Sequence, residues 1–323
     1  MVRNHHRTLK TALRVATLVG ALLFLAPCTA QSVQLLLVRA DSLLDSDKPQ
    51  RALDVYDQAI KKESSTATFL GRARAWYALD RMDRFLQDVE SALRIDSSSA
   101  EAHYQRAVYA LRTEDSATAE YHAGKAIANA RENRLRARSC YLRGEALFGL
   151  NRNEVAIASF EQGLALGMED ANGMRLLARL YDNEDRYSDA LRILERLCEM
   201  DPGDLGHWTN RGYELIMLAR YDEALPMIER ALGYDPDEPV ALSNRAYLHL
   251  KTGKDKEAWA DVEKSLRNYP SNPYALRTRA MLRLKRGERD KACDDLTVAK
   301  ALGDVPEVDQ LLKDNCGSAP KKR

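Results

Sequence analysis

Residues 208–236 read WTNRGYELIMLARYDEALPMIERALGYDP, and two later stretches share their pattern. Residues 242–270 read LSNRAYLHLKTGKDKEAWADVEKSLRNYP, and residues 276–299 read LRTRAMLRLKRGERDKACDDLTVA. The three stretches align without gaps at a period of 34 residues. A period of this length predicts an array of small structural units that bury a continuous core only by stacking on one another.

Small residues recur at two positions of this period. Counted from Leu205, position 8 is Gly212 and position 20 is Ala224. Small side chains there let two antiparallel helices approach closely, while bulky residues at positions 4, 11 and 24 fill the space around the contact. Proline at position 32 cannot continue the second helix. Along the chain, position 8 is occupied by Ala40, Ala73, Ala107, Gly144, Ala178, Gly212, Ala246 and Ala280.

The period and its small, bulky and proline positions resemble those of the tetratricopeptide repeat family. The resemblance implies an all-α fold, a right-handed α-solenoid of about eight helix-turn-helix repeats over residues 33–304 with a C-terminal capping helix. We expect the cap at residues 305–315 and a disordered tail at residues 316–323. The repeats are expected to start at Val33, Thr66, Ala100, Ala137, Ala171, Leu205, Pro239 and Pro273.

Two irregularities interrupt the pattern. Position 20 is alanine in every repeat except the second, where it is Phe85. A bulky ring at this contact predicts that the second helix pair splays or packs in a shifted way. The third and fourth repeats are spaced by 37 residues, which places three extra residues near residues 131–136. We expect a longer linker or a slight kink there, between an N-terminal block of three repeats and a C-terminal block of five.

The first 30 residues have the three parts of a secretory signal. Residues 1–14 are basic, residues 15–26 form an unbroken run of apolar or small residues, and small residues follow up to Ala30. The apolar run is too short to span a bilayer, which needs about 20 residues. The pattern predicts a signal peptide over residues 1–30, cleaved after Ala30, and a chain exported to the bacterial periplasm, the envelope or the exterior.

Residues 25–28, Leu-Ala-Pro-Cys, leave a second interpretation open. They resemble a bacterial lipoprotein box, in which Cys28 would be lipidated and would bring the chain into contact with a membrane. The sequence departs from that box because proline stands where a small residue is expected. Cleavage after Ala30 is therefore the preferred interpretation.

Composition and charge exclude several functions. The net charge is +1, but four basic residues and no acidic one lie in residues 1–30, so the rest of the chain carries −3. A slightly acidic body does not favour a nucleic-acid partner, which needs a basic stripe. The chain has no nucleophile, metal-ligand or phosphate-loop motif, so we expect neither catalysis nor a cofactor or metal.

Position 7 is arginine in seven of the eight repeats. The arginines could form a cationic ladder for an acidic ligand, or each could pair with an acid of its own second helix. In three repeats an aspartate follows 16 residues later, a spacing that brings the two together in a short helical hairpin. The structural role is therefore favoured for the pairs Arg72 and Asp88, Arg245 and Asp261, and Arg279 and Asp295.

The resemblance to the family implies a ligand-binding inner surface, formed by first-helix positions near 2, 5, 6, 9, 12 and 13. Tyrosine there offers a large apolar body with a polar tip, which suits recognition. The family's clamp for a peptide carboxylate needs lysine and arginine at positions that Gly206, Tyr274 and Thr278 occupy, so that clamp is incomplete. The candidate ligand-binding residues are Tyr104, Tyr141, Asn210, Tyr213, Asn244 and Tyr247.

The cysteines show no metal-binding spacing. In an oxidising compartment Cys293 and Cys316 can form a disulfide that ties the cap to the last repeat, and free thiols are the alternative. Cys140, at position 4 of its repeat, is expected to fill the core.

These observations predict an exported scaffold that binds a protein or peptide partner through the inner surface of its repeats. One alternative is an accessory protein that binds a glycan polymer on aromatic platforms. However, Trp208 stands at a core position, which weighs against it. A second alternative is a structural protein that associates with itself.

Overall fold

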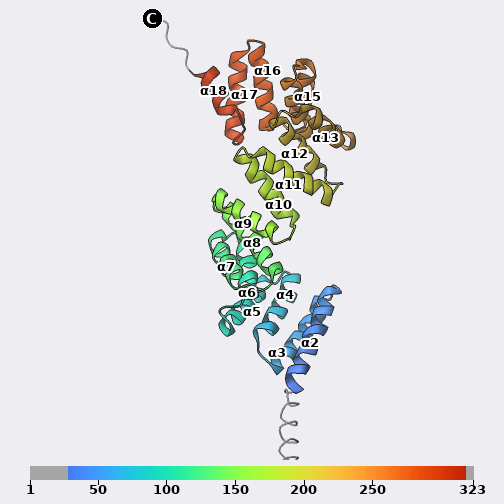
Figure 1. Cartoon of the computed structure of the whole chain (residues 1–323), viewed down its shortest axis with the longest axis vertical. Coiled ribbons are helices and arrows are strands. Elements are labelled where there is room, and N and C mark those ends of the chain that lie inside the picture. Colours follow the sequence, from blue (N-terminus) through green and yellow to red (C-terminus); the bar gives the residue numbers. More distant parts are fainter. Residues whose placement is uncertain (1–27, 318–323) are drawn as a thin grey trace, which may run out of the picture. The chain divides into compact units, whose positions relative to one another are not determined.

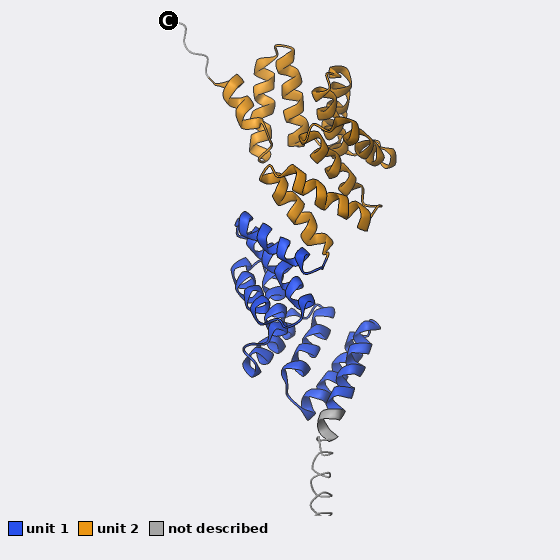
Figure 2. Ribbon diagram, in the orientation of Figure 1, with its two compact units in different colours: residues 1–168 blue, residues 169–323 orange. Residues whose placement is uncertain are grey.

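The computed structural model describes residues 28–317, with side chains from Ser32 onward. The predicted signal peptide, apart from its last three residues, and residues 318–323 of the predicted tail lie outside this range. The described part of the chain is built of helices and contains no strand, so the predicted all-α solenoid of helical repeats is confirmed. The chain divides into two compact units, residues 1–168 and residues 169–323 (Figure 2).

Successive helices pack against each other as antiparallel pairs, as α16 and α17 show (Figure 1). The first unit contains α2 (Cys28–Asp45), α3 (Pro49–Lys62), α4 (Thr66–Ala78), α5 (Met82–Ile95), α6 (Ala100–Arg112), α7 (Ser116–Asn129), α8 (Asn133–Gly149) and α9 (Asn153–Ala165). The second contains α10 (Ala171–Asn183), α11 (Tyr187–Met200), α12 (Leu205–Met217), α13 (Tyr221–Tyr234), α14 (Pro239–Lys251), α15 (Asp255–Asn268), α16 (Pro273–Lys285), α17 (Arg289–Leu302) and α18 (Val308–Cys316).

Local chemistry explains where the helices begin and end. Pro273 opens α16 at a position whose N–H needs no partner, and the side chain of Asn272 accepts hydrogen bonds from the next free N–H groups. Each first helix ends in a tight turn closed by a backbone hydrogen bond, such as Arg220 N to Leu215 O at 2.8 Å. The turns place one residue in the left-handed region: Asp47, Asp80, Glu114, Asn151, Asp185, Ala219, Gly253 and Gly287.

The close approach of paired helices depends on the small residues of the period. The alanines at position 8, and those at position 20, are buried. A Cβ atom added to Gly212 would lie 2.5 Å from Cγ1 of Ile228, and one added to Gly144 would lie 2.6 Å from the ring of Phe160. Glycine is required at these two positions because the partner helix fills the space.

The structure shows neither of the two irregularities that the sequence predicts. The helix pair α4 and α5 packs along its length like the other pairs, because the ring of Phe85 is buried between Tyr77 and Tyr109 instead of separating the helices.

The extra residues near 131–136 form no long linker. They extend α8, which starts at Asn133 and not at Ala137, because nothing in residues 133–136 breaks a helix. The boundary between the two units falls instead after Met168.

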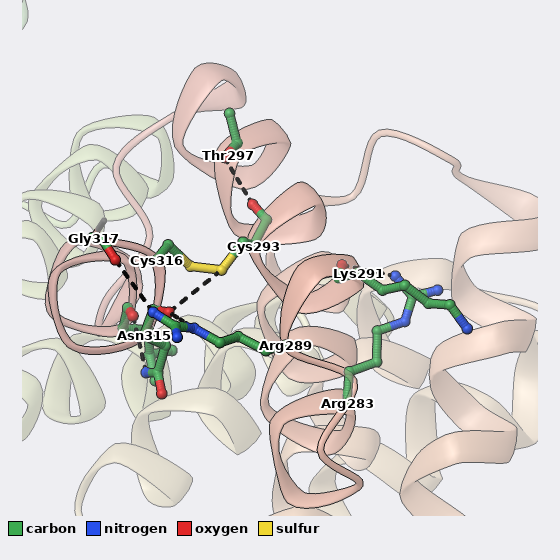
Figure 3. Close-up of a disulfide and its surroundings, with 9 residues drawn as sticks. Arg283, Arg289, Lys291, Cys293, Thr297, Asn315, Cys316 and Gly317 are labelled. Carbon is green, nitrogen blue, oxygen red and sulfur yellow. Dashed lines mark hydrogen bonds between the residues drawn. A yellow bond between two sulfur atoms is a disulfide. The ribbon is translucent and has the colours of Figure 1, made fainter. Parts of the chain in front are cut away.

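The C-terminal cap is joined covalently to the last repeat. Cys293 of α17 and Cys316, the last residue of α18, form a disulfide (Figure 3), so Cys316 belongs to the cap and not to the tail. Arg289 donates to the backbone oxygens of Asn315 and Gly317, which holds the end of α18 on α17 from a second point. The cap helix occupies residues 308–316, and residues 303–307 connect it to α17.

Replacing both Cys293 and Cys316 by serine should lower the free energy of unfolding by about 3 kcal/mol. The bond closes a loop with a sequence separation of 23, and removing it enlarges the entropy of the unfolded chain by about that amount. Urea unfolding of the oxidised protein and of the double variant measures the difference. Dithiothreitol should destabilise the unaltered protein and leave the variant unchanged, since Cys140 and Cys198 are already free thiols. Equal stability of oxidised protein and variant would contradict this expectation.

Candidate ligand-binding site

The second unit carries a pocket of about 370 Å³ on the face formed by its first helices. We call it the unit 2 pocket. Helices α10, α12, α14 and α16 contribute most of its walls, and Leu194 of α11 also lines it. Of these first helices, α12 packs on α14 and α14 packs on α16. The lining residues that carry its chemistry are Asp182, Asn210, Tyr213, Glu214, Asn244 and Tyr274.

Three polar side chains of this pocket have a buried atom without a partner. Glu214 is 3% exposed and Tyr213 is 7% exposed. Neither Oε2 of Glu214, nor Oδ1 of Asp182, nor the hydroxyl of Tyr213 makes a hydrogen bond within residues 28–317. Buried polar atoms normally have partners, because an unsatisfied one costs about 1–3 kcal/mol. A pocket that keeps three of them is built to receive a polar ligand or water.

Burial changes the titration of both carboxyl groups. Desolvation, and then the charge of Asp182, raises the pKa of Glu214 to about 9. Desolvation, and then the charge of Asp185, raises the pKa of Asp182 to about 6, although the guanidinium of Arg277 opposes the rise. At neutral pH the empty pocket therefore holds an ionised Asp182 and a protonated Glu214.

Aromatic and amide groups complete the walls. The rings of Tyr213 and Tyr274 meet edge to face with their centroids 5.6 Å apart. Asn210 is exposed at the pocket, whereas Asn244 is buried and donates from Nδ2 to the backbone oxygen of Thr209 at 3.2 Å. Three of the predicted ligand-binding residues, Asn210, Tyr213 and Asn244, thus line one pocket.

Tyr247 does not line the unit 2 pocket, and its predicted ligand-binding role stays a prediction. Its side chain is 2% exposed and its hydroxyl donates to Oε2 of Glu307 at 2.7 Å. The guanidinium of Arg277 lies 3.9 Å from the centre of its ring and donates to the backbone oxygen of Pro306 at 3.4 Å. The segment before α18 therefore covers Tyr247, an interaction between residues 60 positions apart that the repeat pattern does not contain.

The two candidate tyrosines of the first unit differ from each other. Tyr104 lines a smaller pocket of about 280 Å³, where Arg138 stacks on its ring at 4.4 Å and donates to its hydroxyl at 2.7 Å. Tyr141 is 6% exposed and donates to the backbone oxygen of Met168 at 2.7 Å. Its ring packs against Phe160 and Gly163 and lines neither of the two pockets, so its predicted ligand-binding role stays a prediction.

The recurrent arginines connect helices. Arg72, Arg245 and Arg279 each make a two-point ion pair with the aspartate 16 residues later, with N–O distances of 2.8 to 3.0 Å. Three other position-7 arginines pair with an acid on the second helix of the preceding repeat instead of their own. These pairs are Arg106 with Glu90, Arg143 with Glu120, and Arg211 with Glu195.

Metal binding and membrane spanning find no support in residues 28–317. No group of three or more His, Cys, Asp or Glu side chains is placed to hold a metal ion there. Within the same range, no helix combines the length and the apolar character needed to cross a bilayer. His103 and His122 lie with their Nδ1 atoms 2.9 Å apart, but no third ligand joins them.

Sequence reasoning missed the residues that give the unit 2 pocket its charge. Asp182 and Glu214 lie among many acidic residues of the chain, and nothing in the sequence distinguishes a buried acid from one on a solvated helix face. At Tyr274 the sequence shows only that a residue of the family's clamp is missing, and at Arg277 it gives no signal. The one available signal is position, because Asp182 stands at position 12 of its repeat, on the expected inner surface.

Paired helices of one period, with small residues at positions 8 and 20 and a pocket on the first-helix face, define a helical-repeat scaffold. The tetratricopeptide repeat family model matches residues 37–100, 141–204 and 209–273, more than half of the chain. The chain belongs to the tetratricopeptide repeat family.

Individual relatives are similar only in part. A tetratricopeptide repeat and J domain-containing co-chaperone of Cryptococcus neoformans is 34% identical over 96 residues, which are 29% of this chain and 18% of that protein. The chain therefore spans less than a fifth of the length of this relative.

Two solved structures share the fold with a TM-score of 0.55. The type IV pilus biogenesis factor PilW is 16% identical, and the match covers 65% of this chain and 97% of the PilW chain. The C-terminal part of a repeat protein of Cytophaga hutchinsonii is 17% identical, and the match covers 75% of this chain and 98% of that chain.

Proposed function

We propose that this protein is an exported, non-catalytic scaffold that binds a protein or peptide partner through the unit 2 pocket. The tetratricopeptide fold is typical of proteins that bind protein or peptide partners. The observation that carries the proposal is the concentration of unsatisfied polar atoms and tyrosine rings in one pocket of about 370 Å³. A preformed site of this kind binds with little loss of conformational entropy on the scaffold's side.

A pair of matched variants tests the pocket. Val240 is 40% exposed and lines the pocket, whereas Val298 of α17 is 48% exposed and does not line it. Val240→Trp should fill the opening and weaken partner capture by about tenfold or more, because a bulky ring excludes the ligand without removing a hydrogen bond. Val298→Trp adds the same side chain elsewhere and should capture like the unaltered protein. The readout is recovery of bound proteins from an envelope fraction, and equal recovery by both variants would contradict the proposal.

Export rests on different observations. The basic start and short apolar run of residues 1–30 support a cleaved signal peptide. The disulfide between Cys293 and Cys316 supports an oxidising compartment, since such bonds are rare in the cytosol. Mass spectrometry of the mature N-terminus tests this: a peptide that starts at Gln31 supports cleavage after Ala30. A lipidated Cys28 would instead establish a membrane-anchored lipoprotein, and an intact Met1 would exclude export by this signal.

Arginines cover two of the three tryptophans, which weighs against the glycan alternative. Trp208 and Trp259 could serve as sugar platforms, but arginines already stack on both. Arg230 lies 4.0 Å from the ring centre of Trp208, and Arg286 lies 3.9 Å from that of Trp259. Neither tryptophan lines the unit 2 pocket. A protein or peptide partner is therefore the function that the pocket supports.

A further inference from the structure

The partnerless atoms of the unit 2 pocket indicate the chemistry of its ligand. We propose that the pocket binds a primary ammonium group of the partner, either a lysine side chain or a peptide N-terminus. The proposal rests on the proposed function and adds the chemical class of the group that enters the pocket. It is carried by Asp182, Tyr213 and Glu214, each of which lines the pocket and has an atom without a hydrogen bond.

The number and type of these atoms match an ammonium group. Oδ1 of Asp182 and Oε2 of Glu214 are carboxyl oxygens, and the hydroxyl oxygen of Tyr213 can also accept. An ammonium group offers three N–H donors and no acceptor. Glu214 and Tyr213 are more than nine-tenths buried, so a hydrogen bond formed at these atoms is only weakly screened by solvent. A hydrogen bond to a charged group contributes about 1.5–3 kcal/mol, more than a neutral one.

The walls suit the rest of such a ligand. Tyr213 and Tyr274 present aromatic rings to the pocket, and an ammonium group is attracted to the face of an aromatic ring. The aliphatic stem of lysine packs on apolar surface while its head is held by polar groups. A volume of about 370 Å³ lies at the lower end of the range for ligand pockets and fits a side chain better than a folded domain.

The acids of the pocket are already influenced by one buried cation, Arg277. Arg175 is exposed and lies 3.7 Å from Asp204, so its charge is directed toward that acid. Arg277 lies against the rings of Tyr247 and Tyr274 and forms no ion pair with Asp182 or Glu214 in the described part of the chain. Its guanidinium nevertheless acts to lower the pKa of Asp182 and of the Tyr213 hydroxyl, so a bound ammonium group shares these groups with it. The titratable or charged groups near Glu214 come from four helices and one turn. They are Asp182, Arg179 and Arg175 from α10, Asp185 in the turn before α11, Tyr187 at the start of α11, Tyr213 from α12, and Tyr274 and Arg277 from α16.

Binding of an ammonium group has a proton signature. The raised pKa of Glu214, about 9, means that its carboxyl group is protonated in the empty pocket at pH 7.5. A cation beside it favours the carboxylate, so binding transfers this proton to the buffer. The ligand's own ammonium group, with a pKa near 10.4 for lysine, stays protonated. Binding of a lysine side chain should therefore release up to about one proton, whereas a peptide N-terminus, with a pKa of about 7.7–8.0, is partly deprotonated and takes up part of that proton itself.

Synthetic peptides test the proposal on the full mature chain. The probe is a glycine-rich peptide with one central lysine, an acetylated N-terminus and an amidated C-terminus. Titration calorimetry should show binding that weakens by about tenfold or more when the lysine is acetylated or replaced by norleucine. A lysine-free peptide with a free N-terminus separates the two sources of ammonium: binding of this peptide assigns the site to an N-terminus. Equal binding of the lysine and acetyl-lysine peptides, or preference for a glutamate peptide, would overturn the proposal.

Variants locate the binding in the pocket. Glu214→Gln keeps the size and the hydrogen-bonding capacity of the protonated acid, so the fold should persist, but it cannot become negative. The variant should bind the lysine peptide about tenfold more weakly and release no proton in buffers of different ionisation enthalpy. Glu223→Gln, on the exposed side of α13 next to Arg220, is the matched control and should bind like the unaltered protein. Unchanged affinity and unchanged proton release in Glu214→Gln would refute the assignment.

The two proposals fail in distinguishable ways. If Val240→Trp loses its partner while no ammonium peptide binds, the pocket is a partner site for other chemistry and only this inference is wrong. If Val240→Trp keeps its partner while the lysine peptide binds with proton release, the pocket binds ammonium groups but is not the partner site.

Discussion

Replacing Asp295 by alanine is expected to lower the free energy of unfolding of the second unit by about 3–5 kcal/mol. The Asp295 carboxylate is 5% exposed and accepts hydrogen bonds from Arg279 at 2.8 and 3.0 Å and from Arg283 at 2.7 Å. Alanine would remove the short hydrogen bonds of two largely buried guanidinium groups and leave Arg279 only the more distant Glu263, at 3.7 Å. Breaking a buried ion pair from one side costs about that much. Urea denaturation followed by circular dichroism measures the change.

The control is Asp189, a more exposed acid that, like Asp295, contacts two arginines. Asp189 of α11 contacts Arg186 at 2.8 Å and Arg192 at 3.0 Å, but all three side chains are substantially exposed. Asp189→Ala should cost about 1 kcal/mol or less, because water and salt screen exposed ion pairs. If the two alanine variants lost equal stability, burial would not be what makes the Asp295 cluster important.

Replacing Phe160 by alanine is expected to destabilise the first unit by about 3–5 kcal/mol. The ring of Phe160 is completely buried, lies against Gly144 of the partner helix and has its centroid 6.1 Å from that of Tyr141. Removing it leaves a cavity that the two helices cannot close, because their spacing is also set by Ala156 and the neighbouring repeats. Thermal and urea unfolding, with a probe specific to the first unit, measure the loss.

An exposed aromatic residue of the same unit is the control. Tyr121 is 56% exposed, and Tyr121→Ala should cost about 1 kcal/mol or less. A second comparison uses Gly144→Ala, whose added Cβ would clash with the Phe160 ring. The alanine should be better tolerated when Phe160 is already leucine, so that the two substitutions are coupled. Strict additivity, or a loss in Phe160→Ala no larger than in Tyr121→Ala, would contradict the proposed packing.

The helical hairpins could be predicted because they depend on neighbours close in sequence. A small residue at position 8 and another at position 20 determine which helix faces meet, and proline or a capping side chain sets the starts of α14 and α16. Glycine is needed at only some of the interhelical turns. Ala219 adopts the same left-handed conformation as Gly253, because the backbone hydrogen bonds that close the helix end compensate for its cost.

The arginine pairs show where local reasoning reaches its limit. The spacing of 16 residues correctly placed Arg245 beside Asp261, since both lie in one hairpin. Arg211 has no aspartate at that spacing and pairs with Glu195 of the preceding helix instead. Which of two neighbouring helices supplies the acid depends on how repeats stack, a contact that the sequence of one repeat does not contain.

The sequence by itself determined the repeat architecture, because a 34-residue period with small residues at the helix contacts is compatible with few other folds. The tertiary structure decided the chemistry of the surface. It placed Glu214 and Asp182, from different repeats, in one pocket, and it covered Tyr247 with Glu307 from the segment before the cap. The physical reason is that burial and the resulting pKa of a side chain depend on residues that are far away in the chain, and no pattern within one repeat records them.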